Sequence, residues 1–246
     1  MLHVIGDIHG QFNKLQTLLQ KQGLVSEQGD WIGEEQDKLL FVGDFFDRGE
    51  GGIEALDLAM HLYAQNHAEV LLGNHECFIL GVLFFPDFVI EDLQLTMKEH
   101  WLNIGGNESD LNRIRDKHIS FLLNSPFMLK KGDTLFTHAD STLYLKYGNS
   151  VQEVNEQLSQ LLHDKKADQY AFIVEAFADR LCFYHHEKAL NNFLDTYRAS
   201  NLVHGHTPIQ LMTGECHDKP FFYSSAVNVD GGMYMGGDGF IYSVQV

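Results

Sequence analysis

Acidic, histidine and amide side chains gather in five short clusters along the chain, and each cluster directly follows a short apolar run. Such runs have the length and composition of buried β-strands. In an open α/β sheet, the loops at the carboxyl ends of the strands meet at one crevice, where ligands bind. The sequence therefore predicts one site that receives Asp, His and Asn side chains from several loops, which is the donor set of a metal centre, and we expect two metals there. The clusters are Gly6-Asp7-Ile8-His9-Gly10, Gly43-Asp44-Phe45-Phe46-Asp47-Arg48-Gly49, Gly73-Asn74-His75-Glu76, Thr137-His138-Ala139-Asp140 and His204-Gly205-His206-Thr207.

The spacing in the first two clusters indicates how a cation would be held. Asp7 and His9 lie two residues apart, so in extended backbone both side chains point the same way and one metal can take both. Asp44 follows its strand immediately and can bridge two cations with its two carboxylate oxygens. Taken singly, the first pair fits a turn aspartate beside a surface histidine, and the second cluster fits the acidic start of a helix. The recurrence of the pattern favours the metal site.

The other polar residues of the clusters complement these ligands. Arg48 offers a planar fork of donors that suits a phosphate group. The amide oxygen of Asn74 is a hard oxygen ligand, whereas His75 could bind a metal or act as an acid. His138 and His206 follow two further strands and complete a set of nitrogen and oxygen donors. A lone histidine after a strand is more often structural, but that reading explains five such positions poorly.

The elements that must position these residues alternate in the first half of the chain. Apolar runs predict strands and helical spacing of apolar residues predicts helices, which gives β-α-β-α-β with right-handed crossovers. Residues 24–37 are typical of an exposed loop or hairpin. The tail from Phe221 to Val246 predicts antiparallel strands that close a second sheet. The predicted strands are Leu2–Ile5, Leu39–Val42, Val70–Leu72, Thr134–Phe136 and Leu202-Val203, and the helical regions are 13–22, 53–64, 77–125 and 151–198.

Length and composition limit the possible function classes. With 246 residues, we expect a single domain over 1–246, with residues 77–125 as a mostly helical insertion near the site. The formal net charge of −17 argues against a nucleic-acid polymer as partner. No apolar run is long enough for a membrane span, and no secretory signal fits the first residues, so we expect a cytoplasmic protein without a membrane partner. Cys77, Cys182 and Cys216 show no disulfide or zinc spacing, and the oligomeric state stays open.

Taken in order, these clusters make the chain resemble the metallophosphoesterase (calcineurin-like) superfamily, specifically its phosphoprotein phosphatase branch. The motifs GDxHG, GDxxDRG, GNHE, a lone His and a GH pair extend from Gly6 to Thr207. Trp101 followed by Gly105-Gly106 resembles the small bacterial and bacteriophage serine/threonine protein phosphatases. The resemblance implies an α/β fold: a β-sandwich of two mixed sheets flanked by helices, with the metal site at the C-terminal ends of the strands.

The resemblance also implies roles for individual residues. Arg48 would clamp the phosphoryl group together with Asn74, which would also bind a metal. The resemblance also implies a second phosphate-binding arginine about 25 residues before the last histidine of the motifs, His206. Arg180 stands at about that position. His75 would be the general acid, oriented by Asp47. The implied metal ligands are Asp7 and His9 for one metal, Asp44 as the bridge, and Asn74, His138 and His206 for the other.

The predicted activity is hydrolysis of a phosphomonoester by a metal-activated hydroxide, with two divalent ions, Mn²⁺ first and Fe or Zn as alternatives. The substrate would be a phosphorylated serine or threonine in a protein or peptide, or a small phosphoester. An alternative is a hydrolase of dinucleoside polyphosphates such as diadenosine tetraphosphate, whose members usually lack the aspartate that stands here as Asp47. A third is a metal-binding regulatory module without catalysis. Pro208 occupies the place where nuclease and cyclic-nucleotide branches carry another histidine.

Overall fold

The computed structural model describes residues 1–215 and 218–245, so Cys216 and Val246 lie outside the described residues. Among the described residues the strands form two larger sheets and one short hairpin. The strands are β1 (Leu2–Ile5), β2 (Lys38–Phe41), β3 (Ala68–Val70), β4 (Val89–Ile90), β5 (Leu95–Thr96), β6 (Met128–Lys131), β7 (Thr134–Thr137), β8 (Asn201–His204), β9 (Phe221–Tyr223), β10 (Ala226–Asn228) and β11 (Ile241–Val244). The helices are α1 (Phe12–Lys21), α2 (Gly52–Ala64), α3 (Asn74–Phe84), α4 (Met97–Asn103), α5 (Glu108–Arg113), α6 (Asp116–Asn124), α7 (Val151–Asp164), α8 (Ala167–Phe177), α9 (Cys182–His185), α10 (Glu187–Tyr197) and α11 (Ile209–Thr213), with 3-10 turns η1 (Thr142–Lys146) and η2 (Met233–Met235).

Both larger sheets are mixed. The first has the order β11-β1-β2-β3, in which β1, β2 and β3 run parallel and β11 is antiparallel to β1. The second has the order β6-β7-β8-β10-β9, with β7, β8 and β10 parallel and an antiparallel strand at each edge. The parallel strands of each sheet therefore deliver the loops that follow them to one edge of that sheet.

Alternating side chains of the strands hold the two sheets together. In β2, Leu40 packs between the sheets, whereas Leu39 and Phe41 on the opposite face belong to the core that the helices cover. In β8, Val203 lies between the sheets and Leu202 under the helices. This period of two is what a pleated strand imposes, and because both faces of these strands are buried, their sequences read as continuous apolar runs.

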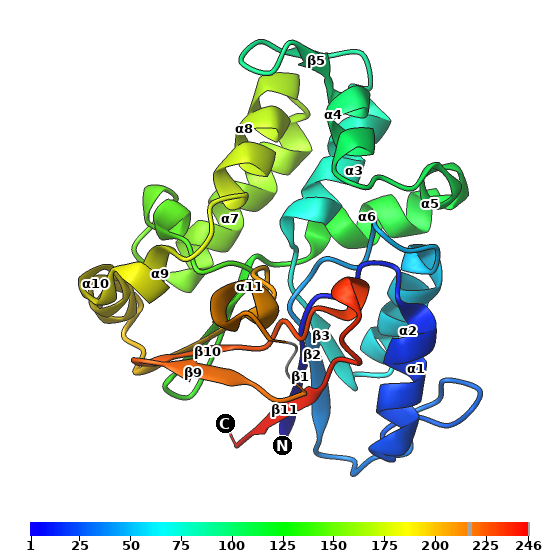
Figure 1. Ribbon diagram of the computed structural model, residues 1–246, viewed down its shortest axis with the longest axis vertical. Coiled ribbons are helices and arrows are strands. Elements are labelled where there is room, and N and C mark those ends of the chain that lie inside the picture. Colours follow the sequence, from blue (N-terminus) through cyan, green and yellow to red (C-terminus); the bar gives the residue numbers. More distant parts are fainter. Residues whose placement is uncertain (216–217, 246) are drawn as a thin grey trace.

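The helices flank the sandwich on both sides and extend above it (Figure 1). Helices α1 and α2 lie beside the first sheet, and α9 and α10 lie toward the second. Helices α3, α4, α7 and α8 rise above the sheets, with the β4–β5 hairpin at the top. Because β1 begins at the lower end, near the N-terminus, the parallel strands point their carboxyl ends toward this helical layer.

The structure confirms the predicted fold class, the five predicted strands to within two residues, and the two helical crossovers. Residues 77–125 are mostly helical but also contain the unpredicted β4–β5 hairpin, and 24–37 form a loop with one antiparallel bridge between Val25 and Trp31. The prediction for the tail is confirmed in part, because β9 and β10 pair antiparallel at the edge of the second sheet. It was wrong for the other pairings: β11 joins the first sheet, and β10 runs parallel to β8, because strand partners depend on long-range packing that alternation alone does not encode.

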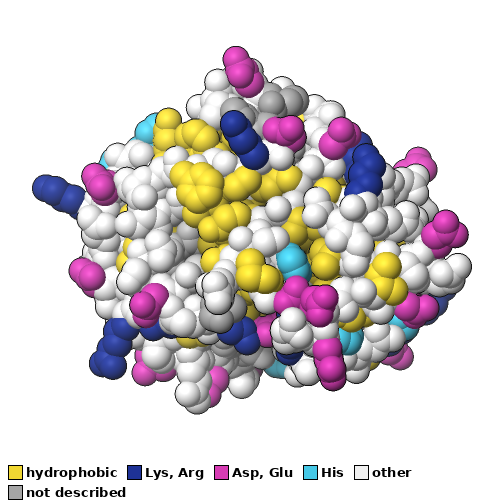
Figure 2. Space-filling view, turned by 90° about the horizontal axis from the view of Figure 1, so that it is seen from below, with side chains coloured by type: hydrophobic (Ala, Val, Ile, Leu, Met, Phe, Trp, Pro, Cys, Tyr) yellow, Lys and Arg dark blue, Asp and Glu magenta, His cyan; other side chains and the backbone are white. Residues whose placement is uncertain are grey.

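The lower end of the molecule, away from the carboxyl ends of the parallel strands, has hydrophobic side chains at its centre (Figure 2). The strands β9 and β11, each at the edge of its own sheet, contact one another through the rings of Phe222 and Tyr242, whose centroids are 6.0 Å apart. Phe222 is 62% exposed. In the described part of the chain, no helix has the length and apolar character needed to cross a membrane. Both Cys77 and Cys182 are free thiols.

Candidate active site

Five strand-end loops bring the predicted residues together at the upper edge of the sandwich. Asp7 and His9 follow β1, Asp44 follows β2, Asn74 and His75 open α3 directly after β3, and His138 and His206 follow β7 and β8. All seven of these side chains are buried. The backbone does not follow the extended path that the spacing of Asp7 and His9 predicts, because His9 has φ of +46°.

Left-handed backbone is common in these loops. Positive φ occurs at the non-glycine residues His9, Asp44, Asp47, Arg48 and His206. L-residues other than Asn, Asp and Gly adopt this conformation rarely, and it clusters at functional sites, where the surrounding structure enforces it. Left-handed backbone turns the chain tightly at such a residue instead of continuing the path of the strand. This turn, and not extended spacing, is how Asp7 and His9 come to face the same point.

Asp44 lies at the centre of two groups of potential metal ligands. One group is His9, Asp44 and His75, and the other is Asp44, His138 and His206. Asp44 Oδ2 is 3.5 Å from His9 Nε2, and its Oδ1 is 3.4 Å from His138 Nε2. One carboxylate oxygen of Asp44 thus faces the histidine of the first group and the other faces a histidine of the second group, as a ligand that bridges two cations requires.

The remaining predicted ligands border these groups. Asp7 Oδ2 is 3.8 Å from His9 Nε2. On the other side, His138 Nε2 lies 3.0 Å from Asn74 Oδ1 and 3.1 Å from His206 Nδ1. The structure therefore brings together every residue for which a metal-binding role was predicted.

The electrostatics of the site depend on Asp44. Burial alone would raise the pKa of Asp44, but the surrounding histidines, first among them His138 and then His75 and His9, hold it well below its usual range. Asp7 behaves in the opposite way, because burial, together with the nearby Asp230 and Asp44, raises its pKa well above the usual value. Concentrated carboxylates of this kind are costly to ionise unless a cation lies between them.

Burial lowers the pKa of His9, His138 and His206, which favours the neutral imidazoles that bind metals. The Nδ1 atoms of His9 and His138 each pair at 2.9 Å with a backbone carbonyl, of Phe46 and Val42 respectively. An Nδ1–H that donates to a carbonyl leaves Nε2 with its lone pair, so both rings present a ligand atom to the site.

Two features of the site fit cations. Asp7 Oδ2 is buried and has no hydrogen-bond partner among the described residues. His138 Nε2, which carries a lone pair, lies 3.0 Å from the amide oxygen of Asn74. That oxygen is also a hydrogen-bond acceptor. Facing acceptors without a proton or a cation between them are unfavourable, so this donor set fits divalent metals with nitrogen and oxygen ligands.

His75 and Asp47 form a close pair beside the ligand groups. His75 Nδ1 lies 2.5 Å from Asp47 Oδ2, and both side chains are fully buried. Burial alone would lower the pKa of His75, but the carboxylates of Asp44 and Asp47 raise it above its usual value. The ring is therefore oriented through Nδ1 while its Nε2 faces the site, 4.0 Å from Asp44 Oδ2.

The two arginines reach the site from different elements. Arg48 Nη1 lies 2.9 Å from His9 Nε2, and its Nη2 lies 3.3 Å from His75 Nε2. Arg180, in the loop between α8 and α9, donates a hydrogen bond from Nη1 to the backbone carbonyl of His206. The structure thus places both predicted phosphate-binding arginines at the rim of the ligand groups, one on each side.

Sequence reasoning assigned no role to Glu76, although the third cluster contains it. Its carboxylate is fully buried and accepts hydrogen bonds from the backbone N–H groups of Asp44, Phe45 and Gly73 at 2.7, 2.8 and 2.9 Å. Burial, with Asp44 nearby, raises the pKa of Glu76 to about 7. Glu76 ties the loop after β2 to the start of α3. Its place in the cluster Gly73-Asn74-His75-Glu76 was a sequence signal from which a role for Glu76 could have been predicted.

The tail contributes two further residues that sequence reasoning missed. Asp230 follows the strand β10, is fully buried, and has a pKa that burial raises to about 7. Tyr234 lies over Arg48, with the guanidinium carbon 4.2 Å from the ring centroid, and its ring meets that of His9 edge-on. Asp230 is itself an acid after an apolar run, so the signal used for the other clusters could have found it.

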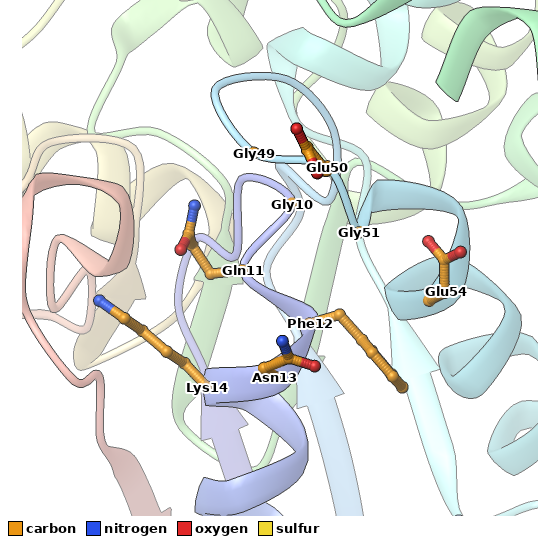
Figure 3. Close-up of a pocket in the computed structure, with 9 residues that line it drawn as sticks. All are labelled: Gly10, Gln11, Phe12, Asn13, Lys14, Gly49, Glu50, Gly51 and Glu54. Carbon is orange, nitrogen blue, oxygen red and sulfur yellow. The ribbon is translucent and has the colours of Figure 1, made fainter. Parts of the chain in front are cut away.

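A pocket of about 690 Å³ opens beside the ligand groups, between the loop that leads into α1 and the loop that leads into α2 (Figure 3). Gly10 and Gly49, which directly follow His9 and Arg48, are among the residues that line it. Lys14 crosses one side of the pocket toward the tail and donates to the carbonyls of Met233 and Gly237 at 2.8 and 2.7 Å.

The comparison with protein families agrees with this geometry. The model of the family "Calcineurin-like phosphoesterase" matches residues 2–210. The chain belongs to the calcineurin-like phosphoesterase family. It is therefore a metal-dependent phosphoesterase, and the family's two-metal site corresponds in kind to the two His and Asp groups described above.

Curated relatives of this phosphoesterase carry two kinds of name. A bis(5'-nucleosyl)-tetraphosphatase PrpE (asymmetrical) from Anoxybacillus flavithermus is 30% identical over 240 residues, which cover 95% of this chain and 86% of the relative. Shewanella-like protein phosphatase 1 from Plasmodium berghei is 26% identical over 248 residues, covering 92% of this chain and 66% of the relative. The phosphoesterase thus resembles both nucleotide hydrolases and protein phosphatases.

Among solved structures, the phosphoesterase is similar to the cold-active protein-tyrosine phosphatase of a psychrophilic Shewanella species. The TM-score is 0.71 at 21% identity, with 98% of this chain and 73% of that chain covered. A protein serine/threonine phosphatase from Saccharomyces cerevisiae gives a TM-score of 0.56 at 16% identity over 97% of this chain and 70% of that one. These likenesses establish the shared fold.

Proposed function

We propose that this phosphoesterase hydrolyses phosphomonoesters of serine and threonine in proteins or peptides. The observation that carries the proposal is the buried pair of His75 and Asp47 beside Arg48, at the edge of the ligand groups. A phosphomonoester of an alcohol has a poor leaving group, so its hydrolysis gains from an oriented acid. The pair supplies that acid, and the arginine supplies a bidentate partner for the phosphoryl oxygens.

In this proposal two divalent cations bind where the geometry has gathered the donors. Asp7 and His9 would hold one, and Asn74, His138 and His206 the other, with Asp44 between them. When bound, the cations would supply a nucleophile at neutral pH and polarise the phosphoryl group. Nitrogen and carboxylate donors suit Mn²⁺, Fe or Zn²⁺, and we propose Mn²⁺ as the working ion.

The remaining steps belong to the protein's own side chains. Arg48 and Arg180 would bind the phosphoryl oxygens from the two sides of the site, with Asn74 in contact as well. His75 would donate the proton on Nε2 to the departing serine or threonine oxygen. Asp47 Oδ2, which lies 2.5 Å from His75 Nδ1, would accept the proton-bearing Nδ1 as a hydrogen-bond donor. This bond would keep the ring in the orientation that presents Nε2 to the leaving oxygen.

A second candidate is an asymmetrical hydrolase of dinucleoside tetraphosphates. The relative from Anoxybacillus flavithermus, 30% identical over 240 residues, supports it. In that reaction the leaving group is a nucleotide phosphate, which is more acidic than an alcohol and departs without a proton from His75. The Asp47–His75 pair is therefore the feature that separates the two candidates chemically, and it favours the phosphomonoesterase.

The test is kcat/KM of the Mn²⁺-loaded protein on a phosphoserine peptide and on diadenosine tetraphosphate, measured side by side. A preference for the peptide of about a hundredfold or more, the scale that a general acid contributes, supports the proposal. A preference for the dinucleotide supports the second candidate instead. His75→Asn separates both from a regulatory module, because a catalyst loses turnover on the peptide while keeping its metals.

A further inference from the structure

Helix α4 and the two glycines after it contact Asp47 and Arg48 in the loop that follows β2. Trp101 in α4 is fully buried, and its indole Nε1–H donates a hydrogen bond to Asp47 Oδ1 at 2.9 Å. The other oxygen of the same carboxylate, Oδ2, pairs with His75 Nδ1. Asp47 therefore has one oxygen bound by an indole and one by an imidazole, and the three side chains form a continuous buried chain.

The glycines allow this approach. A Cβ on Gly106 would lie 2.3 Å from the indole ring, so only glycine leaves room for Trp101 in its present position. Gly105, with φ of +102°, accepts a hydrogen bond from the backbone N–H of Arg48 at 2.7 Å, and a Cβ there would lie 2.9 Å from Arg48 Cγ. Trp101 and Gly105 thus hold two consecutive residues, Asp47 and Arg48, that share left-handed backbone at φ of +70° and +64°.

The anchor is separate from the metal ligands. Within the described part of the chain, the indole N–H bonds to Asp47 alone, which is not a predicted metal ligand, whereas the ligand groups are held by strand-end loops and by Glu76. A buried carboxylate with a single fixed partner can rotate about its side chain, but one with two fixed partners has one orientation. The hydrogen bond from Trp101 therefore sets the plane of Asp47 and, through it, the direction of His75 Nε2.

We propose that Trp101 is a positioning residue for proton donation by His75, which it orients through Asp47. The inference rests on the proposed role of His75 and goes beyond it, since it assigns a catalytic consequence to helix α4. Its signature is dependence on the leaving group. Loss of orientation slows the departure of a basic alkoxide or phenoxide, which needs a proton, and leaves the departure of an acidic phenol almost unchanged.

The experiment compares Trp101→Phe with the wild type on phenyl phosphate and on 2,4-dinitrophenyl phosphate, with Mn²⁺ present. Phenol has a pKa of about 10, whereas dinitrophenol leaves unprotonated. We expect kcat on phenyl phosphate to fall about ten- to a hundredfold, as for other residues that orient a catalytic group. On dinitrophenyl phosphate we expect a change within about twofold. Trp31→Phe, at the half-buried second tryptophan, is the matched control and should change neither rate.

Two outcomes would overturn the inference: an equal loss on both substrates, or no loss on phenyl phosphate. His75→Asn measured on the same substrate pair keeps the proposed function separate. If His75→Asn lowers kcat equally on both substrates, the proposed role of His75 as proton donor is wrong. If His75→Asn shows the split and Trp101→Phe does not, only the role of Trp101 fails.

A double-mutant comparison provides an independent test. In an Asp47→Asn background, Trp101→Phe should add no further loss on phenyl phosphate, because its path to His75 is already broken. An added loss of the original size would contradict the inference. Should Trp101→Phe fail to fold by circular dichroism, Gly106→Ala takes its place, because its methyl group would displace the indole without removing it. The same split between the two substrates is expected, and its absence in a folded Gly106→Ala protein would refute the role.

Discussion

Replacing Lys14 by methionine should loosen the tail loop that covers the site. Lys14 lies on α1, and its ammonium donates to two backbone carbonyls of the tail, those of Met233 and Gly237. The same loop carries Tyr234, whose ring lies on Arg48 and against His9. Methionine keeps most of the apolar stem of lysine but cannot donate, so the substitution removes the two hydrogen bonds with little change in packing.

The magnitude follows from the two contacts. A hydrogen bond from a charged donor contributes about 1.5–3 kcal/mol when its acceptor stays buried, and a half-buried lysine regains water when the bonds break, so we expect about 2 kcal/mol in total. A change of that size increases the open population of the loop about 30-fold. If Tyr234 then leaves Arg48, the lost cation–π contact, about 0.5–1 kcal/mol, should raise KM about two- to fivefold.

The assay is amide hydrogen exchange over residues 231–239, combined with KM for p-nitrophenyl phosphate. Faster exchange in this segment, with unchanged exchange in β1 and β2, is the expected result. Lys188→Met is the control, because Lys188 is exposed on a different helix, α10, and should leave the loop unaffected. Unchanged exchange in residues 231–239 for Lys14→Met would show that the ammonium does not anchor the loop.

Three further predictions concern the metals, the second arginine and the surface. Asp44→Asn should lower the metal content to fewer than two ions per chain by elemental analysis, since one side of the bridge loses its charge; full content would refute bridging. Arg180→Gln should raise KM for p-nitrophenyl phosphate about tenfold, from loss of a charged bond to phosphate, with metal content retained. The hydrogen bond from Arg113 lowers the pKa of Glu54 below its usual 4.5. Glu54→Gln should therefore be less stable than the wild type above pH 4.5, as measured by urea unfolding. The difference in stability should disappear as the pH falls from 4.5 through the lowered pKa of Glu54.

The sequence by itself determined the fold class and the residues that gather at the site. Buried parallel strands read as apolar runs, and the side chains that follow them must meet at one edge of a sheet, so their positions along the chain already specify their convergence. His9, Asp44, His138 and His206 were found in this way. Their chemical identity followed from residue type, because imidazole and carboxylate donors together indicate a metal.

Only the tertiary structure decided how these residues are held. The link from Trp101 to Asp47, the anchoring of the tail by Lys14 and the pairing of β11 with β1 all join segments distant in the sequence. The left-handed turn at His9 is likewise held from another loop, because the backbone N–H of His9 donates to the carbonyl of Asp44. Local patterns report which face of an element is apolar, but not which distant element covers it. Hydrogen bonds such as those to Asp47 depend on that packing, and therefore leave no periodic trace in the sequence.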